Sequence, residues 1–378
     1  LIAAGLTIKS LNNLKAVDMG FSTDNVAISK VDLNWTVYSN GEERWQISQQ
    51  VLQEVRQLPY VTSSALSMTY PNDTVAANFR RIRNAIQLDD RDFNQDDVLP
   101  DAYSRPVTDG YFDTLGSEIL FGRDFTSDDD DQGVQVAIIN SKLAQHLWPN
   151  ENAVNHRISL NRGENWFTII GVVDDIREHG ADSSTSFQIY FPMAQSPSGH
   201  VSVLAKYSGE NLSKFHQDFK AIVKRLDNRQ PISKNESLEQ ASQNSIALQT
   251  FLAKLLTGFS LLALIITISG VSGVMSYMVN IRTREIGIRM AIGANKLNVV
   301  SLILLYGIKL TALGLVIGLT SGYFSGSFLS EHLFDIQAFD IAIYSATFIG
   351  LLAISIMASF LPAYRASSIP PMKALKSS

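Results

Sequence analysis

Long runs of hydrophobic residues, almost free of charge, fill the last third of the chain. No charged residue occurs from Leu255 to Ile281 or from Ile341 to Tyr364, and Lys309 is the one charge between Leu297 and Ser330. About 20 apolar residues allow one helix to cross the hydrocarbon core of a bilayer. The pattern therefore predicts membrane-spanning helices near residues 255–280, 305–329 and 341–363.

The first residues of the chain are also apolar. Leu1 to Ile8 carries no charge and is followed by Lys9, but it is too short to span a bilayer by itself. We expect residues 1–15 to be the end of a truncated first transmembrane helix, which would give the intact unit four helices. The chain is then a fragment, or the second half of a longer polypeptide.

The pattern changes between residues 16 and 245, where shorter elements are expected. Alternating or continuous apolar runs predict strands at Asn25–Leu33, Val61–Ser67 and Trp166–Val173. Helical spacing of apolar residues predicts helices at Trp45–Leu58 and Asn211–Leu226. The predicted fold class is a multi-pass α-helical membrane protein with a large mixed α/β extracytoplasmic domain, residues 16–245, followed by a domain of membrane helices, residues 246–378.

Charge in the connecting segments predicts how the helices are oriented. The connector at residues 281–296 has four basic residues and one acid, whereas the connector between the last two helices has three acids and no Lys or Arg. Basic connectors remain in the cytoplasm. The connector 281–296 is therefore expected to be cytoplasmic, and the domain that precedes the 255–280 helix is expected to lie outside, in a protein of the cell inner membrane.

Overall composition supports this division of the chain. Residues 1–245 contain 22 Lys+Arg and 32 Asp+Glu, a net charge of −10, while residues 246–378 contain 9 and 4, a net charge of +5. The chain has no cysteine, which excludes disulfides and thiolate metal sites. Nothing in the composition indicates binding to nucleic acid.

Candidate chemistry in the external domain is weak. The segment Asp128–Gly133 resembles the start of a calcium loop, but its twelfth position is Ile139 instead of Glu. Asp174 and Asp175 are adjacent, so a strand would point them in opposite directions, and we interpret them as a strand end that faces water. We expect no catalytic residue, no cofactor site and no metal site, and therefore no enzyme.

The chain also has no phosphate-binding loop of the form G-x-x-x-x-G-K-[ST]. ATP and Mg²⁺ would therefore have to be bound by a partner subunit.

Several motifs resemble one family of membrane proteins. The segment Arg282–Ala294 (RTREIGIRMAIGA) and the tail Pro362–Leu375 (PAYRASSIPPMKAL) resemble the FtsX-like, MacB-like ABC transporter permeases. Thr108–Gly116 (TDGYFDTLG), Gly122–Phe125 (GRDF) and Ile170–Arg177 (IGVVDDIR) are similar to the periplasmic core domain of that family. The resemblance covers nearly the whole chain. It extends to duplicated permeases of this family, which have two such units in one polypeptide.

This resemblance implies a set of partners. Such permeases have four helices per unit and act with a cytoplasmic ABC ATPase, the lipid bilayer and a second permease unit, which is either an identical chain or the upstream half of the same polypeptide. MacB-like members pass the motion of ATP binding to the periplasmic domain, which acts there on a substrate or an adaptor. They do not carry substrate between their helices.

The connector 281–296 is the candidate ATPase-coupling segment. Residues 283–292 are predicted to form a short cytoplasmic helix with ion pairs Glu285–Arg289 and Arg282–Glu285, and to end at Gly293. Two apolar sides suggest that this helix lies between the membrane helices and a groove of the partner. The candidate coupling residues are Arg282, Arg284, Glu285, Ile286, Gly287, Arg289 and Gly293. An alternative is that the arginines only set topology through anionic lipid.

Four glycines recur every fourth residue within the 305–329 helix. This spacing places them on one stripe of the helix, where another backbone can approach closely. Packing inside the subunit and a seam between two permease units are both consistent with the stripe, which comprises Gly314, Gly318, Gly322 and Gly326.

The leading functional hypothesis is a permease subunit that couples ATP hydrolysis by a separate ATPase to motion of the external domain, for efflux or extraction of a substrate. The alternative is an FtsX-type signalling scaffold that regulates a periplasmic partner without transport. A membrane-anchored enzyme is disfavoured because no catalytic constellation was found.

Overall fold

The computed structural model describes residues 1–34, 36–73, 81–82, 86–89, 100–161, 163–292, 295–330, 333–337 and 339–367. The chain divides into two compact units. One is the external domain, Val17–Ala247, and the other joins Leu1–Ala16 to the residues from Leu248 onwards. The expected limits of the external domain, residues 16 and 245, differ from these by one and two positions.

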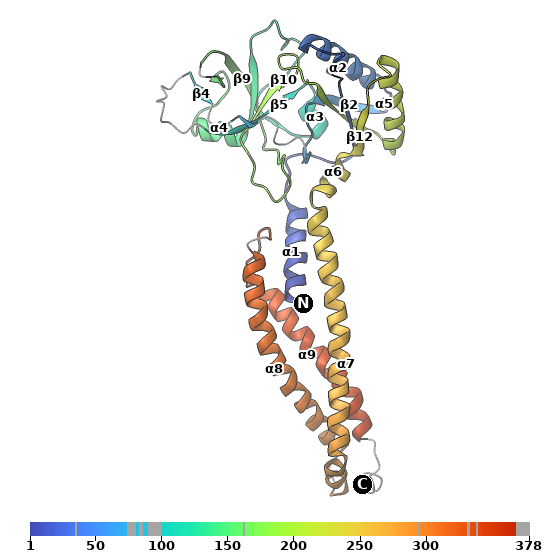
Figure 1. Cartoon of the computed structure of the whole chain (residues 1–378). Coiled ribbons are helices and arrows are strands. Elements are labelled where there is room, and N and C mark those ends of the chain that lie inside the picture. Colours follow the sequence, from blue (N-terminus) through green and yellow to red (C-terminus); the bar gives the residue numbers. More distant parts are fainter. Residues whose placement is uncertain are drawn as a thin grey trace. The chain divides into compact units, whose positions relative to one another are not determined.

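The external domain contains both helices and strands (Figure 1). Its strands are β1 (Val26–Asp32), β2 (Val61–Ser67), β3 (Arg81–Ile82), β4 (Gln87–Leu88), β5 (Ala102–Val107), β6 (Ile119–Gly122), β7 (Val136–Asn140), β8 (Arg157–Ser159), β9 (Trp166–Val173), β10 (Gln188–Pro192), β11 (His200–Tyr207) and β12 (Ile232–Ser237). Its helices are α2 (Gly41–Arg56), α3 (Tyr111–Leu115), α4 (Ser141–Leu147), α5 (Leu212–Leu226) and α6 (Leu238–Ser245).

The strands described form one mixed sheet in the order β12-β1-β11-β2-β5-β10-β7-β9-β8-β4, with β3 beside β5 and β6 beside β9. Strand β1 pairs antiparallel with both β11 and β12. Strand β10 runs parallel to β5, and β7 runs parallel to β9. This mixed α/β domain confirms the predicted fold class of the external part.

Alternation along β1 divides the core of the domain between the two faces of the sheet. Ala27 and Val31 belong to the cluster that includes α2 and α5, whereas Val26 and Ile28 belong to the cluster that includes α3 and α6. Successive side chains of a strand point to opposite faces, so a one-residue slip would exchange the two clusters. Both faces of β1 are covered, which fixes its register.

Helix α4 begins where β7 ends. The side chain of Asn140 caps it by accepting a hydrogen bond from the Leu143 N–H, and Asp175 Oδ1 accepts one from the Lys142 N–H at 2.9 Å. A carboxylate is favourable at a helix N-terminus because unpaired N–H groups point toward it. The expectation that Asp175 faces water is therefore wrong, whereas its neighbour Asp174 is exposed.

The second unit consists of α1 (Ile2–Ala16), α7 (Ala247–Ala291), α8 (Lys296–Ser330) and α9 (Ile341–Ser367). Among the residues described, α7, α8 and α9 are long and apolar enough to cross a membrane. Most of their side chains are not buried by protein, as expected for helices that face lipid. The three predicted spans thus correspond to three helices.

The helix boundaries differ from the prediction at the basic connector. Helix α7 continues through the expected end of the span and through residues 283–291 without a break, so there is no separate cytoplasmic helix. The segment contains no proline, and Gly287 alone weakens a helix by only about 1 kcal/mol. Helix α8 begins at Lys296, earlier than the predicted residue 305.

Helix α1 is attached to the segment between α8 and α9. Ser10 Oγ accepts a hydrogen bond from the Phe334 N–H at 3.0 Å, and Asn13 Nδ2 donates one to the Asp335 carbonyl at 3.1 Å. Lys9 forms an ion pair with Asp340. Helix α1 is therefore an integral part of the second unit.

Candidate coupling site

The basic end of α7 packs against the first half of α8 and against α9. Met275, Val279 and Ile286 of α7 are buried together with Val299 and Ile303 of α8 and with Ala363 of α9. Burial of these apolar side chains fixes the side of α7 that faces the neighbouring helices. The opposite side of α7 takes no part in this buried cluster.

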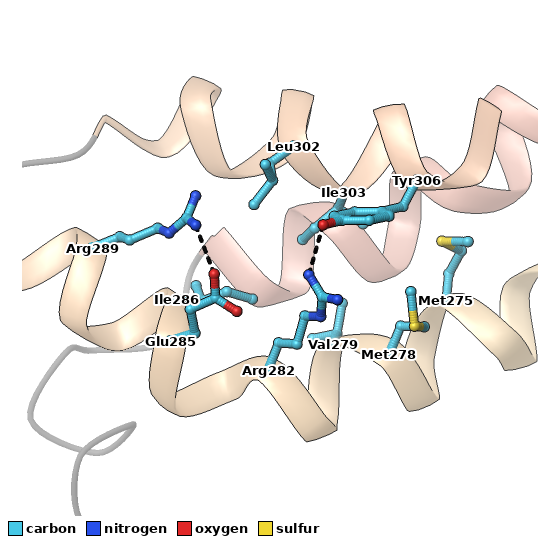
Figure 2. A pocket seen from close by; sticks show the side chains of 10 residues that line it. All are labelled: Met275, Met278, Val279, Arg282, Glu285, Ile286, Arg289, Leu302, Ile303 and Tyr306. Carbon is cyan, nitrogen blue, oxygen red and sulfur yellow. Dashed lines mark hydrogen bonds and ion pairs between the residues drawn. The ribbon is translucent and has the colours of Figure 1, made fainter. Parts of the chain in front are cut away.

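A small pocket lies between α7 and α8 at this end, with a cavity volume of about 20 Å³. Figure 2 shows Arg282 reaching across it to Tyr306 of α8. Arg282 Nη1 donates a hydrogen bond to Tyr306 Oη at 2.8 Å, and the guanidinium carbon lies 4.6 Å from the ring centroid. This cation–π contact directs Arg282 toward α8.

Glu285 and Arg289 lie one turn apart on α7 and form the expected i,i+4 ion pair, with 2.6 Å between Oε1 and Nη2. Their side chains are 46% and 50% exposed, so the pair stabilises the helix only weakly, by roughly 0.3–0.5 kcal/mol. Arg282 was expected to join this pair, but it contacts Tyr306 instead.

Three isoleucines form an exposed stripe on the other side of α7, the last of them one residue past the helix end at Ala291. Ile281, Ile288 and Ile292 are spaced i, i+7, i+11, so they share one side of the helix, and they are 63%, 42% and 81% exposed. Exposed Arg284 and Glu285 flank them. We call this set of residues the exposed α7 stripe.

Two of the proposed coupling residues are buried and do not belong to the exposed α7 stripe. Ile286 is 6% exposed and Gly287 is buried, so neither can contact a partner directly in this arrangement. The sequence shows two apolar sides of the helix but does not show which one faces α8. Gly293 lies outside the described residues.

The glycine stripe on α8 divides into two halves. Gly322 is half-buried, and a side chain there would overlap Ile2 of α1, so this half serves packing within the unit. Gly326 is buried as well. Gly314 and Gly318 are exposed, and no other residue lies within 4 Å of a Cβ built at either position.

The acidic loop of the external domain uses its carboxylates internally. Asp129 accepts two hydrogen bonds from Arg123, at 2.7 and 2.8 Å, and Asp130 accepts from two backbone N–H groups of the loop. Burial opposes ionisation of Asp129, but the bonds from Arg123 and Thr126 outweigh it and lower its pKa. Arg123, in the Gly122–Phe125 motif, is the residue that sequence reasoning did not connect to this loop.

Family models match both parts of the chain. The MacB-like periplasmic core domain matches residues 14–222, more than half of the chain, and the FtsX-like permease C-terminal domain matches residues 257–371. The chain belongs to the family of MacB-like ABC transporter permeases. This permease therefore lies in the inner membrane with a large extracytoplasmic domain, which places the Ile292 end of α7 in the cytoplasm.

Several known proteins are similar to this permease. The macrolide export ATP-binding/permease protein MacB of Aggregatibacter actinomycetemcomitans is 27% identical over 56% of this chain and 34% of its own length. The ABC transporter permease YknZ of Bacillus subtilis is 23% identical over 73% of this chain and 70% of its own. The crystal structure of the periplasmic region of MacB from Actinobacillus actinomycetemcomitans has a TM-score of 0.40 and 17% identity, covering 62% of this chain and 97% of that one.

The permease spans only part of the exporters it matches. It covers 34% and 42% of the first two MacB proteins, the second from Mannheimia succiniciproducens. Both proteins are described as ATP-binding as well as permease proteins.

Proposed function

We propose that a separate cytoplasmic ATPase docks on the exposed α7 stripe and that its cycle moves the external domain, which drives efflux or extraction of a substrate. The observation that carries this proposal is the stripe itself. Large apolar side chains flanked by charges stay exposed at the cytoplasmic end of a helix, a pattern typical of an interface. Anchors at i, i+7, i+11 suit a groove that receives one side of a helix.

That the ATPase is a separate protein is part of this proposal. The chain has no phosphate-binding loop, whereas similar MacB proteins are ATP-binding and permease proteins in one chain. Export is the activity in the names of these relatives, and we propose the same class of activity here without assigning a substrate. A second permease unit would complete the assembly, and the exposed Gly314 and Gly318 offer a place for close helix contact.

A charge swap distinguishes docking of the ATPase from the alternative that the arginines only set the membrane topology of the helix. The double variant Glu285→Arg/Arg289→Glu keeps an ion pair at i,i+4 and leaves the net charge of the connector unchanged. If the arginines only contact anionic lipid, the swap has no effect. We expect it to reduce stimulation of the partner's ATP hydrolysis at least tenfold, measured with the full permease in lipid vesicles.

The matched control is Arg365→Glu, which reverses an exposed charge at the cytoplasmic end of α9. This variant should retain most of the stimulation. Full stimulation by the swapped protein, correctly inserted, would refute docking on α7. Stimulation without movement of any substrate would instead favour the FtsX-type signalling function.

A further inference from the structure

Two connectors join the external domain to the membrane helices. The first is Val17–Asp24, between α1 and β1, and the second is α6, which leads into α7. Both connectors are tied to one short segment that follows β9, Asp174–Glu178, which we call the clasp segment. These are the two places where the chain passes from one unit to the other.

Hydrogen bonds join the clasp segment to both connectors, directly to the first and through Asn72 to the second. The Arg177 N–H donates to the Met19 carbonyl of the first connector at 2.9 Å. The Asn72 N–H donates to the Glu178 carbonyl at 2.9 Å, and Asn72 Nδ2 donates to Ser242 Oγ of α6, also at 2.9 Å. Asn72 thus links the clasp segment to the second connector.

The contact with the first connector is very close. Gly20 has φ +71°, and a Cβ at this position would overlap the Asp175 carbonyl oxygen. Only glycine combines this backbone conformation with such an approach. Apolar packing adds to it, because Ile176 is buried in one cluster with Leu238 and Ala241 of α6.

The clasp segment is also held firmly to the sheet. Gln188 Nε2, on β10, donates to the Ile176 carbonyl at 2.6 Å. Glu178 forms an ion pair with Arg105 of β5, and their side chains are only 3% and 11% exposed. Arg105 Nη1 donates a further bond to Tyr111 Oη at 2.9 Å. A buried pair of this kind resists displacement, because separating it leaves two uncompensated charges.

We propose that the clasp segment is the element through which motion of the membrane helices reaches the external sheet, with Asn72 and Glu178 as its positioning residues. This inference rests on the proposed function. Backbone bonds and close packing transmit a displacement, whereas long flexible side chains would absorb it.

Two variants break the contacts while matched controls repeat the same substitution elsewhere. Gly20→Ala disrupts the close approach, and Gly209→Ala is its control, because Gly209 has φ +67° but no atom nearer than 3.6 Å to an added Cβ. Asn72→Gly removes the amide that bonds Ser242, at φ +68°. Its control is Asn155→Gly, at an exposed asparagine with φ +75°.

The measurement is hydrogen–deuterium exchange of the full permease in complex with its ATPase, compared without nucleotide and with trapped ATP. In the wild type and the controls, ATP should change exchange at the end of α7, in α6 and in β9. In Gly20→Ala and Asn72→Gly, the change should persist in α7 and α6 and be lost in β9. Unaltered exchange of the sheet without nucleotide shows that each variant is folded.

The possible failures are distinguishable. A change in β9 that persists in both clasp variants overturns the clasp proposal, as does a wild type in which the change stops at α6. No nucleotide effect at the cytoplasmic end of α7 in the wild type contradicts the proposed function itself, and the clasp proposal falls with it.

Discussion

Ion pairs of similar chemistry in the external domain differ greatly in burial. Arg105 and Glu178 are nearly inaccessible, whereas Arg56 and Asp109, 3.0 Å apart, have side chains 40% and 41% exposed. Water screens the exposed pair, so its net contribution to stability is small. The buried pair has no water to replace a lost partner.

Glu178→Gln should therefore destabilise the protein far more than Asp109→Asn. Both substitutions keep the shape of the side chain and remove its charge. We expect the first to lower the free energy of unfolding by about 3 kcal/mol and the second by about 0.5 kcal/mol. Denaturant unfolding followed by tryptophan fluorescence measures both, and equal losses would contradict the assigned burial.

Acid should weaken the external domain through His216 on α5. Burial lowers the pKa of His216 because it disfavours the charged imidazolium. The unfolded chain takes up this proton near pH 6.5, so the stability that neutral His216 contributes is present above that pH and is lost as the pH falls below it. The melting temperature should accordingly decrease between pH 7.5 and 5.5.

The control for this effect is a second histidine. His216→Gln should flatten the pH dependence of the melting temperature, whereas His146→Gln, at an exposed position on α4, should leave it unchanged. An identical slope in all three proteins would exclude His216 as the source.

Local contacts of the candidate site could be predicted from the sequence, and distant contacts could not. Glu285 and Arg289 are neighbours on any helix, so their pairing follows from spacing alone. Arg282 and Tyr306 are 24 positions apart, and their contact exists only because α7 packs on α8. Ile286 was assigned to the wrong side of α7 for the same reason.

Among the elements, those with a simple apolar pattern were predicted well. Strands β2 and β9 begin and end at the predicted residues. For β9, the polar Asn165 and the charged Asp174 bound a largely apolar run. Strand β11 was missed although it lies in the sheet between β1 and β2. Most of its residues are buried, on both faces, so it lacks the alternation that identifies a half-exposed strand.

The two sides of α7 should respond differently to one substitution. Ile286→Ala leaves a cavity between α7 and α8 and should cost about 3 kcal/mol of stability. Ile288→Ala, two residues away on the exposed α7 stripe, should leave the melting temperature nearly unchanged but weaken capture of the ATPase. Melting in detergent and co-purification measure the two effects, and reversed results would mean that the sides are misassigned.

For the whole molecule, the division into an acidic external domain and a basic membrane unit was visible in the sequence. Charge-free runs and basic connectors are direct consequences of the bilayer, so they do not depend on tertiary contacts. The sequence could not show that α7 is continuous from the external boundary to the cytoplasmic end. As one helix of 45 residues, it leads without a break from the end of α6 to the exposed α7 stripe.

Site-specific photo-crosslinking tests the central claim most directly. A crosslinker would be placed at Ile292, 81% exposed and one residue past the end of α7, and in a second protein at Val134, 73% exposed in the external domain. In intact membranes, Ile292 should yield an adduct with a cytoplasmic ATP-binding protein, and Val134 should not. An ATPase adduct from Val134, or only lipid adducts from Ile292, would contradict the account.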